Sequence, residues 1–427
     1  MSFKNPCSAR MGFFYVPIPH SCIKRHILLN FQHLPLLTIS YMRFYRLTRL
    51  PILFLSCLLV SCSSTKKAIR VQPVSTMNSI RLLGQYDIPY GLSFKNTTVG
   101  GLSGIDYDSK NGLYYLICDD RSAINPARFY TAKIFVSQSG IDSIVFVSVN
   151  YLLQQDGTTF PNNKKDPQHT PDPEAIRFNP VSNTLVWSNE GERIVKDKQV
   201  VLSNPTVHII DTTGKYTGHF QIPANLYMNP GIKGPRQNSV LEGMSFADNY
   251  ASLFVNVEEP LYDDGPRADT TNSNAYIRIM KFDVKTGINT KQYAYPLDPV
   301  AYRPDPPDAY MINGVPDILF MGDDKLLVIE RSFSTGRLAC AVKLYIADLS
   351  EATDISKVPS LQSGILFNAA RKKLLFNMDE TGRYIDNVEG ICFGPVLPNG
   401  KKSLLLVADN NFNPIQKSQV FLFEINE

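Results

Sequence analysis

Short apolar runs separated by polar turns recur along most of the chain. One five-residue pattern stands out: a small or acidic residue, Gly or Ala, Ile or Met, any residue, and an aromatic residue. Clear copies lie at residues 103–107, 174–178, 242–246 and 389–393, and a degenerate copy lies at residues 316–320. In chain order, successive copies begin 71, 68, 74 and 73 residues apart. A repeat of this length indicates a ring or array of similar structural units.

Each copy is followed, after a turn, by a second apolar run that ends in acidic residues. Two such runs joined by a turn containing Gly, Asn or Asp predict an antiparallel hairpin. Further apolar runs add two strands to most units, and four strands make one blade of a β-propeller. The last unit has only three strands, whereas one extra strand at residues 80–88 precedes the first unit.

The economical arrangement places this N-terminal strand in the final blade, where it closes the ring and removes exposed sheet edges. The sequence therefore predicts an all-β protein, a propeller of five four-stranded blades of about 70 residues each. Six blades follow instead if the loop at residues 351–366 contains further strands.

The acidic residues of the repeat are expected to meet at one mouth of the propeller channel. In an antiparallel hairpin, the start of the first strand lies at the same edge as the end of the second strand. The acids that open the first strands are Glu174, Glu242 and Glu389. The acids that end the second strands are Asp120, Glu190, Glu258, Glu330 and Asp409, with arginines nearby at Arg121, Arg193 and Arg331.

The combination of acidic and basic side chains at this mouth has two interpretations. The carboxylates and guanidinium groups can pair with one another and hold neighbouring blades in register. Alternatively, the acids bind a hard cation such as calcium, while the arginines bind an oxyanion. So many carboxylates close together repel one another unless positive charge compensates them.

The repeat resembles the phytase-like propeller family, which is described as having esterase-like activity. The resemblance covers about residues 95–425 and implies a small-molecule phosphate ester or carboxyl ester as substrate. It brings no catalytic motif that can be transferred residue by residue. The residues that carry it are 100–107 with 119–122, 172–176 with 188–190, 241–244, 330–331 and 388–391.

If the protein hydrolyses esters, the mechanism that is compatible with these acids and arginines is metal-assisted. A non-catalytic propeller that binds a ligand or a protein, and a lactonase-like hydrolase, are the alternatives. The residues expected to carry catalysis are Glu174, Glu242, Glu389, Arg121, Arg193 and Arg331, and those expected to bind the metal are Asp120, Glu190, Glu258, Glu330 and Asp409.

Residues 1–61 have the order of a bacterial secretory signal, with a basic segment, an apolar run at residues 51–60 and a small-residue cleavage site. Residues 59–62 look like a lipobox, so we expect lipidation of Cys62. Translation is expected to start at Met42, which leaves residues 1–41 outside the protein.

The same segment predicts the organisation of the chain and its location. Residues 62–78 are expected to form a lipidated tether, and residues 79–427 the propeller. This predicts a membrane-anchored protein of the bacterial cell envelope, in the periplasm or at the outer membrane.

The balance of charged residues and the positions of the cysteines limit the functions that are compatible with the sequence. The chain has 43 Lys plus Arg and 39 Asp plus Glu, and residues 1–61 contain seven of the basic residues and no acidic one. The remainder therefore has 36 basic against 39 acidic residues, which gives no sign of nucleic-acid binding. Cys118, Cys340 and Cys392 lie in apolar runs and are expected to be buried free thiols in a monomer.

Overall fold

The computed structural model describes residues 74, 76–196, 199–271 and 274–427. The predictions on the leader, on Cys62 and on the tether up to residue 73 lie outside the described residues. Within the described part, the helices are three short 3₁₀ turns, at Ala224–Leu226, Asp248–Tyr250 and Met378–Thr381. Among these residues, no helix has the length and hydropathy needed to span a membrane.

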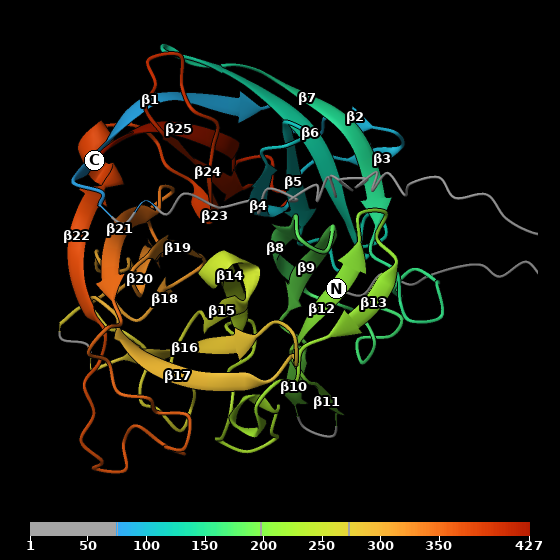
Figure 1. Cartoon of the computed structure of the whole chain (residues 1–427). Helices are drawn as coiled ribbons and strands as arrows, with labels where there is room; N and C mark the ends of the chain where they lie inside the picture. The colour runs from blue at the N-terminus through green and yellow to red at the C-terminus, as the bar shows by residue number, and fades with distance from the viewer. Residues whose placement is uncertain (1–73, 75, 197–198, 272–273) are drawn as a thin grey trace, which may run out of the picture. The chain divides into compact units, whose positions relative to one another are not determined.

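The strands form five antiparallel sheets around a centre, which confirms the predicted five-bladed propeller (Figure 1). Blade one contains β4 (Leu102–Asp108), β5 (Leu113–Cys118), β6 (Arg128–Ser137) and β7 (Gly140–Tyr151). Blade two contains β8 (Pro173–Asn179), β9 (Thr184–Asn189), β12 (Thr206–Asp211) and β13 (Tyr216–His219). Blade three contains β14 (Leu241–Ala247), β15 (Ser252–Val257), β16 (Tyr276–Asp283) and β17 (Asn289–Pro296).

The last two blades complete the ring. Blade four contains β19 (Ile318–Gly322), β20 (Lys325–Ser334), β21 (Ala341–Asp348) and β22 (Arg371–Asn377), with β18 (Met311–Gly314) paired to the far end of β20. Blade five contains β23 (Asn387–Phe393), β24 (Ser403–Asp409), β25 (Ser418–Asn426) and β1 (Ser79–Ile88). Two short hairpins, β2 (Ser93–Phe94) with β3 (Thr97–Thr98) and β10 (Glu192–Lys196) with β11 (Gln199–Ser203), lie outside the blades.

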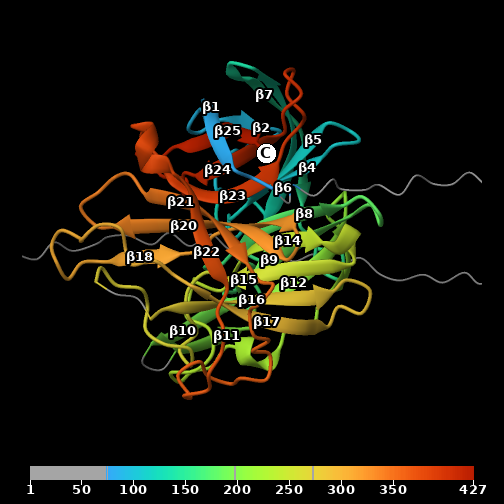
Figure 2. The same ribbon diagram turned by 60° about the vertical axis from the view of Figure 1, so that its left-hand side comes forward.

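The N-terminal strand closes the ring, as the sequence predicts. β1 pairs with β25 along its length, from Ser79 opposite Asn426 to Ile88 opposite Ser418. Figure 2 shows the ring from another side, where β1 again lies beside β25. The structure describes all of residues 351–366, and this loop contains no strand, so the alternative of six blades does not apply.

The repeat pattern reflects the packing of the innermost strands. β4, β8, β14, β19 and β23 contact one another in ring order, with side chains alternating between the blade cores and the channel. The Ile or Met of each copy is fully buried. The second position must be small because neighbouring backbones approach closely. A Cβ atom on Gly104 would lie 2.8 Å from the carbonyl oxygen of Glu174.

A buried ion pair closes the middle of the channel. The Arg177 guanidinium donates hydrogen bonds to both carboxylate oxygens of Asp317, at 2.7 and 2.6 Å. It also donates to a carbonyl oxygen on the innermost strand of every blade, at Ile105, Ile176, Met244, Ile318 and Ile391. The Asp317 carboxylate in turn accepts the backbone N–H groups of Met244 and Ile391. The two ends of the channel are therefore separate sites.

Candidate functional site

Strand register determines which residues face the acidic mouth. The Ile or Met of the repeat pairs with Leu116 in blade one, Trp187 in blade two, Val255 in blade three, Val328 in blade four and Leu406 in blade five. The residue three positions after each of these partners occupies an equivalent place at the channel rim. These residues are Asp119, Glu190, Glu258, Arg331 and Asp409, so the rim contains four acids and one arginine.

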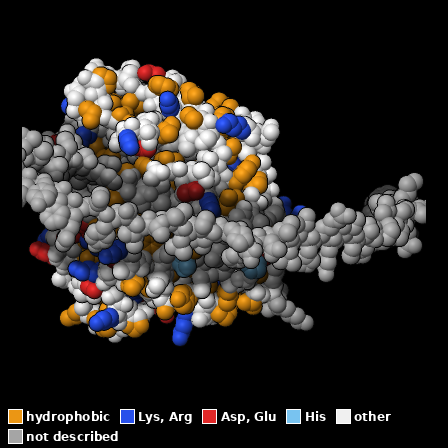
Figure 3. All heavy atoms as spheres, turned by 45° about the vertical axis from the view of Figure 1, so that its right-hand side comes forward, with side chains coloured by type: hydrophobic (Ala, Val, Ile, Leu, Met, Phe, Trp, Pro, Cys, Tyr) orange, Lys and Arg blue, Asp and Glu red, His pale blue; other side chains and the backbone are white. Residues whose placement is uncertain are grey.

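Three innermost strands add a carboxylate near their start, that of Glu174 in β8, Glu242 in β14 and Glu389 in β23. Together with Asp172, which lies just before β8, they form one group of interacting acids, which we call the acid cluster. Its members are Asp119, Asp172, Glu174, Glu190, Glu242, Glu258, Glu389 and Asp409. Acidic side chains elsewhere lie scattered among basic and hydrophobic ones, as on the face in Figure 3.

The cluster is packed by protein but reachable from solvent. Five members are buried, whereas Asp119, Glu174 and Glu389 are partly exposed. Gly101 leaves room for one of them, because a Cβ atom there would lie 2.1 Å from Oδ1 of Asp119. Gly101 also has a φ of +59°, a backbone conformation that favours glycine.

Two arginines contact the cluster. Arg331 forms ion pairs with Glu258 and, at 2.6 Å, with Glu389. Arg121 lies 3.5 Å from Asp172 and 2.6 Å from Glu192, a neighbouring acid outside the cluster. Eight carboxylates therefore meet two guanidinium groups, which leaves a large excess of potential negative charge.

This excess changes the acidities of the cluster. Burial, and then the charges of neighbouring acids, raises the pKa of Glu174, Glu190 and Glu242 well above the ordinary value. Burial raises the pKa of Asp172 to about 6 and that of Glu258 to about 7, although Arg121 and Arg331 act in the opposite direction. A positive ion in the cluster would lower the pKa of the acids that hold it, because it stabilises their ionised form.

The donor groups fit a hard cation. One carboxylate oxygen each from Asp172, Glu174 and Glu190 lies within 4.8 Å of the others. Oε2 of Glu190 and Oδ1 of Asp409 are buried and have no hydrogen-bond partner among the described residues. The Glu190 carboxyl also interacts with another carboxyl, that of Glu242. Oxygen-rich sites with unpaired carboxylate oxygens are the surroundings that Ca²⁺ prefers.

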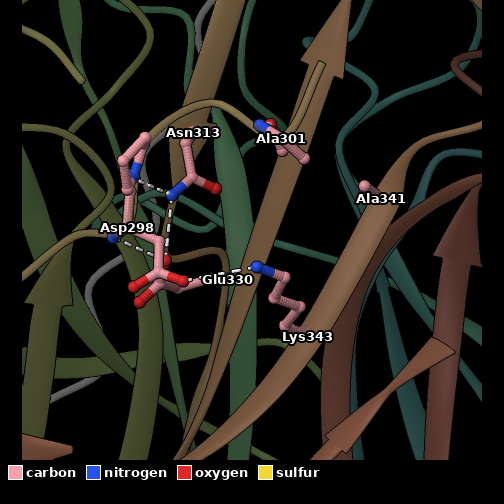
Figure 4. A pocket seen from close by; sticks show the side chains of 8 residues that line it. Asp298, Ala301, Asn313, Glu330, Ala341 and Lys343 are labelled. Carbon is pink, nitrogen blue, oxygen red and sulfur yellow. Dashed lines mark hydrogen bonds and ion pairs between the residues drawn. The ribbon is translucent and has the colours of Figure 1, made fainter. Parts of the chain in front are cut away.

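Six of the acids that the sequence singles out lie in the cluster, and two lie elsewhere. Asp120 forms a buried ion pair with Arg128 at 2.7 Å and caps backbone N–H groups in the loop after β5. Glu330 accepts hydrogen bonds from Tyr295, Asn313 and the backbone N–H of Asp298, as Figure 4 shows in part. Both carboxylates therefore hold loops or neighbouring blades together.

Of the three arginines predicted for the site, two lie at the acid cluster and one lies elsewhere. Arg121 and Arg331 contact the cluster. Arg193 instead donates to the carbonyl oxygens of Asn229 and Gly231, and its guanidinium lies 5.1 Å from the centre of the Tyr262 ring. Its contacts hold a loop.

Two members of the cluster, Asp119 and Asp172, are absent from the predicted set. Asp119 stands three residues after Leu116, as Glu190 stands three residues after Trp187. If the second strands are aligned by the residue that pairs with the Ile or Met of each repeat, the rim position is three residues further on. This alignment would have predicted Asp119 and not Asp120 at the rim, and Arg331 and not Glu330. Asp172 precedes its strand and has no counterpart in the repeat, so only its closeness to Glu174 could have marked it.

Fold and site together define a five-bladed propeller with a cluster of buried carboxylates at one mouth of a closed channel. A sequence profile described as "Phytase-like: Esterase-like activity of phytase" matches residues 97–412. The chain therefore belongs to the phytase-like family.

Comparisons with individual proteins give more distant similarities. Among curated proteins, no sequence matches the chain. An exo-β-1,3-galactanase structure from Phanerochaete chrysosporium aligns with 10% identity and a TM-score of 0.41, covering 80% of this chain and 64% of that one. The chain thus spans a little under two thirds of the galactanase.

Two further structures are similar at the same level. A GH43 β-1,3-galactosidase with galactodeoxynojirimycin aligns with 11% identity and a TM-score of 0.43, covering 78% of this chain and 93% of that one. The periplasmic gluconolactonase of Pseudomonas aeruginosa aligns with 11% identity and a TM-score of 0.35, covering 75% and 84%.

Proposed function

We propose that this protein hydrolyses small phosphate or carboxyl esters at the acid cluster, with calcium as a required ion. One observation carries the proposal: eight carboxylates, five of them buried, meet two arginines, and two of their buried oxygens have no donor among the residues that the structure describes. A structural role alone would pair these oxygens, because an unpaired buried polar group is costly.

Some residues of the site would bind the cation, and others would bind an anionic group of the substrate. Asp172, Glu174 and Glu190 would hold the cation. When bound, a divalent cation polarises an ester oxygen and lowers the pKa of a coordinated water. Arg331 and Arg121 lie beside the cluster and supply the positive charge that stabilises an anionic substrate group.

Proton transfer has a candidate within the same cluster. Glu258 contacts Arg331 and has a pKa raised to about 7 by burial. A carboxyl group with that pKa holds or releases a proton near neutral pH, as protonation of a leaving group requires. We assign this role to Glu258.

Calorimetric titration of calcium into the purified protein, followed by assays on carboxyl and phosphate esters with and without chelator, tests the proposal. We expect binding, and turnover that chelator abolishes. Glu190→Gln should weaken calcium binding by about tenfold or more, because it removes one anionic ligand. Glu351→Gln is the matched control, since Glu351 is exposed and pairs only with Arg371 among the contacts described.

The outcomes separate the candidate functions. Chelator-sensitive turnover identifies a hydrolase, and the preferred ester distinguishes a phosphatase from a lactonase. Calcium binding without turnover would indicate a binding propeller instead. Neither binding nor turnover would leave the carboxylates with a structural role and contradict the proposal.

We also propose that the protein is lipid-anchored in a bacterial cell envelope, because residues 59–62 have the form of a lipobox. Mass spectrometry of the purified N-terminal peptide should show a diacylglyceryl group on Cys62. Cys62→Ala should release the protein from membranes. Equal membrane association of the variant would contradict anchoring through this residue.

A further inference from the structure

The end of the channel opposite the acid cluster opens into a cavity of about 990 Å³. The innermost strands of all five blades contribute to its wall, and Arg177 lies on its inner side. The contacts of Arg177 with Asp317 and with carbonyl oxygens of every blade separate this cavity from the acid cluster. The cavity is therefore distinct from the proposed site of hydrolysis.

The described chain enters the propeller at this cavity. Val74 lines the cavity and is only 2% exposed. It belongs to the same hydrophobic cluster as Met77 and Leu319, and Leu319 also lines the cavity. The residues just before Val74 are therefore joined to the propeller at the cavity wall. We call residues 66–73 the entry segment.

The charged side chains of the wall leave an excess of acids. The acids of the wall are Asp106, Asp108, Asp248 and Asp323, and its bases are Lys110, Arg177 and Lys402. Three of these seven pair with residues outside the wall: Arg177 with Asp317, Asp248 with Lys281, and Lys402 with Glu427. Three acids then remain against one base, Lys110.

Neutral groups donate hydrogen bonds to two of the remaining acids. The Asp108 carboxylate accepts the backbone N–H groups of Lys110 and Asn111, and the Asp106 carboxylate accepts that of Phe178. Burial raises the pKa of Asp106, although Arg177 acts in the opposite direction. A further cationic side chain beside Asp106 would stabilise its ionised form.

The entry segment has the charge and the polarity that complement this wall. Its bases are Lys66, Lys67 and Arg70, it contains no acid, and Ala68, Ile69 and Val71 are apolar. The wall also presents apolar surface, such as that of Val396, which is 66% exposed. Eight residues span at most about 29 Å, which is more than the diameter of about 12 Å of a sphere with the volume of the cavity.

We propose that the entry segment occupies this cavity, with its apolar side chains against Leu319 and Val396 and with Arg70 beside the unpaired acids of the wall. Burial of apolar surface and opposite charge both favour this contact. The covalent link to Val74 favours it further, because it gives the segment a high effective concentration at the cavity. The N-terminal connection of the propeller would then lie at the end opposite the acid cluster and leave the acids accessible to substrate.

Hydrogen exchange on the purified chain from residue 63 to residue 427 tests the proposal. We expect the backbone amides of residues 68–72 to exchange at least about tenfold more slowly than in a synthetic peptide of residues 63–75, because a seated segment is protected from solvent. Exchange at the rate of the peptide would leave the cavity to a small ligand or another chain and would overturn the proposal.

The protection should not depend on protein concentration. A segment that occupies the cavity of its own chain is protected equally in dilute and concentrated solution. Protection that increases with concentration would show that the segment of a second copy is the occupant, and would overturn the proposal.

Charge variants locate the contact. Arg70→Glu should return the exchange to within about threefold of a peptide with the same change, because it places a carboxylate beside the acids of the wall. Lys165→Glu is the matched control, since it reverses the same charge on an exposed residue outside the wall, and it should keep the exchange slow. Circular dichroism and thermal unfolding establish that both variants are folded.

A change in the wall should have the same effect as the change in the segment. The double variant Asp106→Asn with Asp323→Asn removes two negative charges and should speed the exchange by about threefold to tenfold. Asn tolerates the positive φ of +50° at residue 323, so this turn is kept. Slow exchange that persists in Arg70→Glu and in this folded double variant would show that the segment is protected elsewhere and would overturn the proposal.

Discussion

At the scale of single residues, Arg331 neutralises part of the negative charge of the acid cluster. It occupies the rim position that holds an acid in the other four blades, and its guanidinium contacts Glu258 and Glu389. Without it, those two carboxylates would have no cation among the described residues. The acid cluster therefore has two permanent cations, Arg331 and Arg121, which balance only part of its potential negative charge.

Replacement of this arginine should destabilise the protein, most strongly without calcium. Arg331→Met should lower the free energy of unfolding by about 3–5 kcal/mol, because it leaves buried carboxylates unpaired. Urea unfolding measures the loss, and saturating calcium should recover part of it. Arg371→Met, at an exposed ion pair with Asp348, should change stability by less than about 1 kcal/mol. Equal effects of the two changes would contradict this account.

The raised acidities predict an unusual pH dependence. Asp172 and Glu258 have pKa values of about 6 and about 7 in the fold, above the values near 4 of unfolded chains. The folded state thus binds more protons between about pH 4 and 7, so stability should fall as pH rises through this window. Thermal unfolding in chelator should show this slope, and calcium should reduce it, because Asp172 is among the residues proposed to hold the ion. A flat profile in chelator would contradict the shifts.

At the scale of strands, closure of the ring depends on β1. Its pairing with β25 covers an edge that would otherwise expose unpaired backbone groups. A chain that begins at residue 76 keeps this strand, whereas one that begins at residue 90 lacks it. We expect the first to be monomeric and to unfold cooperatively, and the second to aggregate, as gel filtration and thermal unfolding would show. Equal behaviour would mean that β1 is dispensable.

The strand pattern could be predicted because each blade repeats the same hydrophobic alternation. The extra strand at the N-terminus and the missing strand at the C-terminus then fixed five blades and their closure. The hairpins β2–β3 and β10–β11 and the short β18 have no counterpart in the repeat, so periodicity gave no signal for them. Asp120 and Glu330 were each placed one residue from the position that faces the rim, because the register of the second strands depends on pairing that sequence alone does not show.

At the scale of the whole propeller, the Arg177–Asp317 pair joins all five blades. No spacing in the sequence could have shown this, since Arg177 stands at the variable position of the repeat and its partners come from the other four blades. Arg177→Met should lower the free energy of unfolding by about 3–5 kcal/mol, because Asp317 would remain buried and unpaired. The double variant with Asp317→Leu should lose less than the sum of the single changes, as a double-mutant cycle would measure. Additive losses would contradict a coupled pair.

Ring closure also sets an order of events in time. β1 is the first of the described strands in chain order, but its partner β25 is the last of them. During synthesis, β1 must therefore remain without this partner until the other four blades have been made. Contacts between such distant segments form slowly, because a long loop must first be closed. The final blade is complete only after β25 has been synthesised, so a chain truncated before Ser418 lacks the strand on which closure depends.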